Sequence, residues 1–139
     1  MGTWTIPATA QPPVNVSMSP SSGAGTTQTF TFTAASASGY GNIAYMQIIV
    51  NSAASCFFGF SPPNNIYINN PSDAGGVAYG TLGSSGTIQN SQCSLNLAAS
   101  SAVGTSNNLA LNLAITFKSG LQGQQSIYMS AGDNAGLTS

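Results

Sequence analysis

Side chains able to act as acids, bases or metal ligands are scarce in this 139-residue sequence. Its two acidic residues are Asp73 and Asp133, its one basic residue is Lys118, and it contains no histidine. Two carboxylates could share acid–base chemistry or bind calcium, but calcium takes about six to eight oxygen ligands, usually from several carboxylates. Each Asp also lies in a turn-forming segment, residues 71–75 and 132–134, so we interpret both as turn residues.

The other combinations of reactive residues are no stronger. Lys118 and Ser119 have the composition of a Ser–Lys pair, yet the lysine ends a predicted strand and nothing in the sequence orients the serine as a nucleophile. Lys118 with Asn112 or Asn134 and Asp133 has the residue types of an isopeptide cross-link, which we do not expect to form. Histidine, the usual group that titrates near neutral pH, is absent. The sequence therefore predicts no catalytic residue, no metal site, no cofactor and no enzyme activity.

The two cysteines, Cys56 and Cys93, each lie in a segment with the residue pattern of a β-strand. An even number of cysteines in a chain rich in Ser and Thr predicts one disulfide, formed in an oxidising compartment. Closing such a loop stabilises a fold by about 3–4 kcal/mol if the gain is the entropy taken from the unfolded chain. Two buried free thiols are the alternative, whereas a metal site lacks a His or CxxC pair to complete it.

The low charge excludes several classes of protein. About 25% of the residues of a typical soluble protein are charged, against 2% here, with a net charge of −1. A single lysine cannot neutralise a phosphate backbone, so no nucleic-acid partner is expected.

No apolar run is long enough for a membrane span, and no signal peptide opens the chain. A hydrophobic content of 42% excludes disorder, and a net charge near zero favours self-association.

Hydrophobic periodicity of two residues recurs along the chain, and no stretch holds helical spacing with caps. Short strands about ten residues apart, separated by turn residues, predict an all-β fold, an antiparallel β-sandwich. The predicted strands are residues 14–18, 27–33, 43–50, 56–60, 66–68, 75–82, 86–89, 92–98, 109–117 and 125–131.

The end of the chain carries the most specific motif, Ile-Tyr-Met-Ser-Ala-Gly-Asp-Asn-Ala-Gly-Leu over residues 127–137. It resembles bacterial immunoglobulin-like repeats of surface and secreted proteins, in which a late strand runs into an Asp-x-Ala-Gly turn. Residues 14–25 with 29–32, and the segments 86–93 and 111–118, are similar to the same repeats, so that the resemblance covers roughly residues 13–139. It implies an immunoglobulin-like sandwich whose closing strand follows the turn. Asp133 suits that turn because it can accept N–H groups two residues on, and Gly136 can take positive φ.

Residues 2–6 alternate as a strand would, and they are similar to the closing strand of such repeats. Trp4 and Ile6 fall on one face and Thr3 and Thr5 on the other. The chain stops at Ser139 without a closing strand of its own. We therefore predict three parts: a donor strand over residues 1–7, a Pro-containing linker over 8–13, and a sandwich over 14–139 that is incomplete without a closing strand.

Three arrangements of the N-terminal strand remain open. In the first, Gly2, Thr3, Trp4, Thr5 and Ile6 complete the sheet of the next subunit in a groove beside Ile127, Met129 and Ala131. Such a contact is heterologous and generates a filament. In the second, the strand fills the gap in its own domain, across which a seven-residue linker reaches about 25 Å. In the third, it is an early first strand interrupted by prolines or a remnant of a repeat array.

The first arrangement is the predicted function: an extracellular or cell-surface filament subunit whose partners are copies of itself. The alternative is a single spacer or a carbohydrate- or ligand-binding module from a tandem immunoglobulin-like surface adhesin. Aromatic faces stack on sugar rings, so a carbohydrate partner rests on Trp4 and the five tyrosines: Tyr40, Tyr45, Tyr67, Tyr79 and Tyr128.

Overall fold

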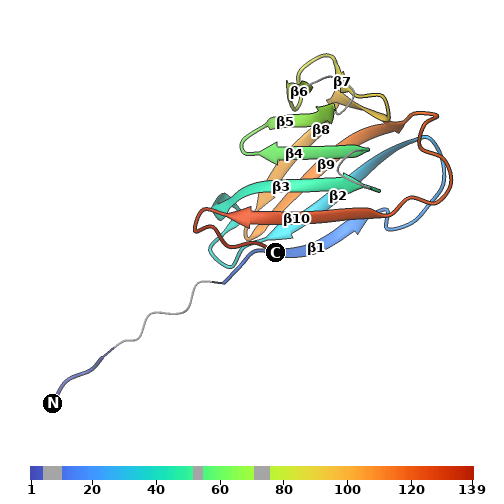
Figure 1. The fold of residues 1–139 in the computed structure, drawn as a ribbon. Helices are drawn as coiled ribbons and strands as arrows, with labels where there is room; N and C mark the ends of the chain where they lie inside the picture. Colours follow the sequence, from blue (N-terminus) through green and yellow to red (C-terminus); the bar gives the residue numbers. More distant parts are fainter. Residues whose placement is uncertain (5–10, 52–54, 71–75) are drawn as a thin grey trace.

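The computed structural model describes residues 1–4, 11–51, 55–70 and 76–139. Two antiparallel five-stranded sheets face each other (Figure 1). The first sheet has the order β1 (Val14–Ser19), β2 (Thr27–Ala35), β9 (Asn108–Phe117), β8 (Cys93–Thr105), β7 (Thr87–Gln89). The second has the order β10 (Ile127–Asp133), β3 (Ile43–Val50), β4 (Cys56–Ser61), β5 (Asn65–Asn70), β6 (Gly76–Thr81). One 3-10 turn, η1 (Tyr40–Asn42), precedes β3.

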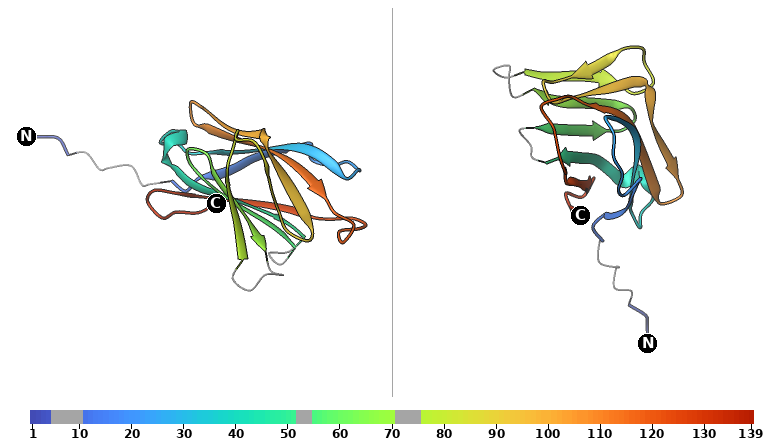
Figure 2. Two further views of the ribbon diagram at one scale, coloured as in Figure 1. Left: turned by 90° about the horizontal axis from the view of Figure 1, so that it is seen from above. Right: turned by 90° about the vertical axis from the view of Figure 1, so that its right-hand side faces the viewer.

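The predicted β-sandwich is confirmed, and the immunoglobulin-like assignment stays a prediction. In Figure 2 the two layers are seen edge-on, with the strands of one crossing those of the other at an angle. Within the described residues no helix has the length and apolar character needed to cross a membrane.

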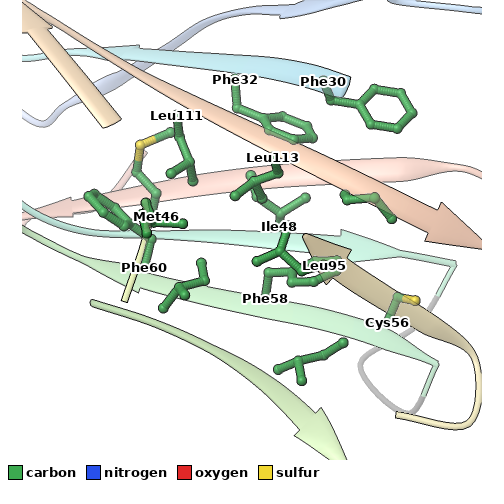
Figure 3. Packing of buried hydrophobic residues seen from close by; sticks show 14 of the residues in the cluster. Phe30, Phe32, Met46, Ile48, Cys56, Phe58, Phe60, Leu95, Leu111 and Leu113 are labelled. Atoms are coloured by element: carbon green, nitrogen blue, oxygen red, sulfur yellow. The ribbon is translucent and has the colours of Figure 1, made fainter. Parts of the chain in front are cut away.

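Alternation in the sequence determines which side chains form the core. In β2 every second residue is buried, and each of these residues pairs with a buried leucine of β9. In β3 and β4 the paired residues that face the core are likewise apolar. Figure 3 shows Phe32 and Leu111 of the first sheet packed above Met46, Ile48, Phe58 and Phe60 of the second. Burying each such side chain contributes about 1.5–3 kcal/mol, so the contact between the layers supplies most of the stability.

A disulfide between Cys56 of β4 and Cys93 of β8 joins the two sheets, with the Cα atoms 6.2 Å apart. The predicted disulfide is therefore confirmed, and free thiols and a metal site at these residues are excluded. Both cysteines are fully buried in the core.

The predicted strand over residues 92–98 was too short, because β8 continues to Thr105. Its ladder with β9 is interrupted by a bulge between Asn96 and Ser101. Within the bulge the Ser100 hydroxyl donates to the Asn96 carbonyl oxygen at 2.7 Å and accepts the Ala114 N–H at 3.0 Å. The Ser100 hydroxyl thus replaces the missing backbone hydrogen bonds between β8 and β9. The strand can therefore continue beyond the bulge.

Candidate strand-acceptor edge

The two lateral sides of the sandwich differ. On one side the connection between β6 and β7 closes the gap between the sheets, because the Leu82 N–H donates to the Asn64 carbonyl oxygen and the Gly83 N–H to the Leu97 carbonyl oxygen, both at 2.8 Å. On the other side β1 and β10 are the last strands of their sheets (Figures 1 and 2). No strand of the described residues pairs with β10 opposite β3. This second side is the open side of the sandwich.

The C-terminal residues already occupy one end of the outer edge of β10. The Ser139 N–H donates to the Ala131 carbonyl oxygen at 2.9 Å, and the Ala131 N–H donates to the Ser139 hydroxyl at 2.9 Å. Thr138 forms an antiparallel bridge with Gly132. Residues 138 and 139 therefore begin a strand that runs antiparallel to β10.

The turn that reverses the chain is held by Asp133. Its Oδ1 accepts the Ala135 N–H at 3.0 Å and the Leu137 N–H at 2.9 Å, and the Asp133 N–H donates to the Leu137 carbonyl oxygen at 2.9 Å. Gly136 has a φ of 84°, a conformation that glycine adopts without strain. Asp133 is only 5% exposed, so its carboxylate serves the turn rather than a ligand.

The rest of the outer edge of β10 lies between Ala131 and Ile127. Backbone groups alternate along a strand, so those of Met129 and Ile127 face the same way as those of Ala131, away from β3. Asn15 of β1 donates its Nδ2 to the Met129 carbonyl oxygen at 3.0 Å, and this contact joins the two open strands. The Met129 and Ile127 side chains pair with buried Ile48 and Val50 of β3 and so face the core. An added strand would meet an apolar inner face here.

A groove of about 1040 Å³ opens at the start of β10, between the β1–β2 connection and the segment that precedes β10. Its polar lining includes Gln125, whose Oε1 is buried without a hydrogen-bond partner, while its Nε2 donates to the Gln122 carbonyl oxygen at 2.8 Å. A buried acceptor left unpaired costs about 1–3 kcal/mol. The large apolar side chains that line the groove include Met18, Phe30, Phe117, Leu121 and Ile127.

The predicted donor residues lie away from this edge. Gly2, Thr3 and Trp4 belong to no strand, Trp4 is 91% exposed, and the N-terminus lies away from the two sheets (Figure 1). Thr5 and Ile6 lie outside the described residues. The exposed Trp4 therefore makes no contact with the groove in this structure.

The other reactive residues of the sequence do not come together. The Lys118 Nζ donates to the Gln89 Oε1 at 2.8 Å and to the Asn90 carbonyl oxygen at 2.7 Å. These bonds direct the ammonium to Gln89 and Asn90 instead of to Ser119. The Oδ1 of Asp133 accepts two turn N–H groups, so the isopeptide group is not assembled either. Asp73 lies outside the described residues. The described residues contain no group of three or more His, Cys, Asp or Glu that could hold a metal.

Asn15 and Gln125 lie within the predicted strands 14–18 and 125–131, but nothing in the sequence places either residue beside the outer edge of β10. Each becomes notable only because the fold brings it there. Of the five tyrosines, Tyr67 and Tyr79 contact each other on the second sheet. Tyr128, 58% exposed, lies on the outward face of β10.

No protein-family model matches this chain, and neither a curated protein nor a solved structure does. What the protein does is therefore inferred from its own edges, cavities and surface residues.

Proposed function

We propose that this protein is a structural subunit of an extracellular filament, in which residues 2–6 of one copy pair with the outer edge of β10 in the next. The observation that supports it is the state of that edge: Thr138 and Ser139 occupy its end at Ala131 and Gly132, and the stretch to Ile127 has an apolar inner face. Strand addition to such an edge gives main-chain hydrogen bonds and pockets for alternate side chains.

The register follows from Ser139. A donor strand that continues its direction lies antiparallel to β10 and begins after Ala131. Placing Trp4 opposite Met129 would put Gly2 opposite Ala131, where Ser139 is already bonded. Moving the donor by two residues places Gly2 opposite Met129 and Trp4 opposite Ile127, and this shift keeps Trp4 on the inner face. The Gly2 N–H then shares or replaces the Asn15 amide at the Met129 carbonyl oxygen. Thr5 and Ile6 continue past the start of β10, opposite Ser126 and Gln125.

This register brings the Trp4 indole to the groove at the start of β10. The groove is lined by Met18, Phe30, Phe117 and Ile127, which suit the ring. A tryptophan that buries about 200 Å² of apolar surface gains about 5 kcal/mol. The indole N–H needs a hydrogen-bond acceptor when it is buried. The unpaired Oε1 of Gln125 is itself buried, so the Gln125 side chain would have to turn toward the groove to accept it.

Charge supports assembly as well. With a net charge of −1, copies of the chain do not repel one another strongly. Donor and acceptor are different surfaces of one subunit, so the contact is heterologous and continues from copy to copy as a filament unless the rotation closes a ring. The disulfide suits an oxidising compartment, in keeping with an extracellular location.

The outer edge of β10 also supports a second candidate function, in which the domain is one module of a tandem array of surface domains. The direction of Thr138 and Ser139 would carry a segment that followed them in a longer polypeptide along β10. In that case the closing strand is supplied in cis, and the domain acts as a spacer. Both functions need the edge to accept a strand, and they differ in where the strand comes from.

The test compares the intact protein with three variants by negative-stain electron microscopy and analytical ultracentrifugation. The intact chain should form filaments, and Trp4→Ala should weaken association about 100- to 1000-fold, the equivalent of about 3–4 kcal/mol. Tyr79→Ala is the matched control, because it removes an exposed aromatic ring from β6, at the opposite edge of the sheet from β10. The last variant lacks residues 1–6 and carries Ser-Gly-Thr-Trp-Thr-Ile after Ser139, where the added serine sets the register so that the Trp lies opposite Ile127 on the inner face. It should be monomeric, with a raised melting temperature.

Two results would contradict the filament. A monomeric intact chain together with a stabilised cis-complemented variant would assign the edge to a tandem array. If the appended strand neither stabilised the domain nor changed its assembly, the edge would not accept this strand at all.

A further inference from the structure

A row of three aromatic rings crosses the outer face of the second sheet, on the side away from the core. Phe57 of β4 lies 6.0 Å from Tyr67 of β5, and Tyr67 lies 5.9 Å from Tyr79 of β6, measured between ring centroids. Their strand neighbours, such as Phe58 and Ile68, are buried in the core. The alternation of the strands therefore directs all three rings to the surface.

Tyr67 lies flat against the sheet because it crosses Gly59 of the neighbouring strand. A Cβ atom added to Gly59 would collide with the Tyr67 ring, so the ring occupies the space that a side chain would fill. One face of the ring covers the backbone of β4, and the other is directed outward. Tyr79, 75% exposed, stands beside it at an interplanar angle of 53°. The two rings make the floor and one wall of a recess.

The recess has a volume of about 500 Å³ and combines these rings with uncharged hydrogen-bonding groups. Ser61, Asn65 and Thr81 line it around Tyr67 and Tyr79. Their hydroxyl and amide groups can both donate and accept hydrogen bonds. None of its lining residues carries an acidic or basic side chain.

We propose that this recess binds a neutral oligosaccharide. One face of a sugar ring consists of C–H groups with partial positive charge, which stack on the negative face of an aromatic ring. The rim of the sugar ring carries hydroxyl groups, and the hydroxyls and amide around Tyr67 can pair with them. A charged saccharide would find no counter-ion in the recess, and a peptide side chain would leave most of the polar lining unpaired. The site lies on β4–β6, at the opposite edge of the sheet from β10, and does not depend on strand donation.

The test titrates the intact protein with maltohexaose, cellohexaose and mannohexaose, followed by amide chemical shifts and by calorimetry. At least one saccharide should shift the amides of β5 and β6. Tyr79→Ala should weaken its binding about tenfold, consistent with the loss of one stacking ring, while Tyr79→Phe should keep most of the affinity. Gly59→Ala should also weaken binding, because the added methyl displaces the Tyr67 ring. Tyr128→Ala and Trp4→Ala should bind as the intact protein does.

The proposal is overturned if none of the three saccharides shifts these amides at millimolar concentration. It is also overturned if Tyr79→Ala binds as tightly as the intact protein, or if the β5 and β6 shifts follow protein concentration alone, which would identify the ring row as a contact between copies.

Discussion

At the scale of single residues, Asn90 has the most complete set of hydrogen bonds in the described chain. It is 3% exposed. Its Nδ2 donates to the carbonyl oxygens of Ser55 at 2.8 Å and Asn69 at 2.7 Å, and its Oδ1 accepts the N–H groups of Gln92 at 2.8 Å and Cys93 at 2.9 Å. One amide thus joins three chain segments beside the disulfide. A buried polar group this well paired fixes the local structure strongly.

We expect Asn90→Ala to lower the free energy of unfolding by about 3 kcal/mol, because buried carbonyl and N–H groups lose their partners. Asn90→Asp should also destabilise, since the NH₂ group is replaced by an oxygen facing two carbonyls. The exposed Asn108→Ala is the matched control, with a change below about 0.5 kcal/mol. Urea unfolding followed by circular dichroism measures all three, and equal stability of the Ala variants would show that the Asn90 bonds carry no net energy.

At the scale of elements, β8 shows how a strand survives an interruption. The residues after Ala98 are mostly small, the alternation of burial changes phase at Ala98 and Ala99, and no apolar side chain beyond that point is fully buried. The ladder continues because the Ser100 hydroxyl bonds to both strands.

Ser100→Ala should therefore cost about 1–3 kcal/mol, because the N–H of Ala114 and the carbonyl oxygen of Asn96 are left without a partner. Ser101→Ala removes the neighbouring hydroxyl, which is exposed and accepts only the Asn112 Nδ2 at 3.1 Å, and should change stability by less than about 0.5 kcal/mol. Thermal unfolding and hydrogen exchange at Ala114 report the difference. Equal effects of the two substitutions would contradict the role given to Ser100.

Strands held by apolar burial could be predicted from the sequence, whereas pairing that depends on a single side-chain hydrogen bond could not. Strands with apolar alternation, such as β2, β3 and β9, were predicted within a few residues of their ends, because burial of one face imposes the pattern. The second half of β8 was not, because its pairing depends on a hydroxyl. The positions of Ile127 and Met129 on one face follow from spacing, but the groove beside them does not. Phe30, Phe117 and Gln125 meet there only in the folded chain.

At the scale of the whole molecule, the sandwich is closed on one side and open on the other. The β6–β7 connection bonds to both sheets, and the disulfide ties β4 to β8. On the open side the described contacts between β1 and β10 include a single side-chain hydrogen bond, from Asn15. The two layers are therefore held together mainly by the core and by the disulfide.

Removal of the disulfide by Cys56→Ala with Cys93→Ala should lower the free energy of unfolding by about 4 kcal/mol, as expected from loop-closure entropy for a sequence separation of 37 residues. Guanidinium unfolding of the variant and of the oxidised chain measures the difference. Reductant should have no effect on the variant, which controls for unrelated actions of the reagent. A variant as stable as the oxidised chain would show that the cross-link adds nothing to the packed core.

The position of the disulfide also governs how far the chain can be stretched. Cys56 and Cys93 enclose the rest of β4 together with β5, β6 and β7, so a pulling force applied at the two termini passes through the S–S bond and bypasses these strands. With a separation of 37 residues and about 3.5 Å per extended residue, the oxidised chain is shorter at full extension by about 130 Å. A chain pulled from its two ends would thus extend by a limited length, and the portion enclosed by the disulfide would carry no load.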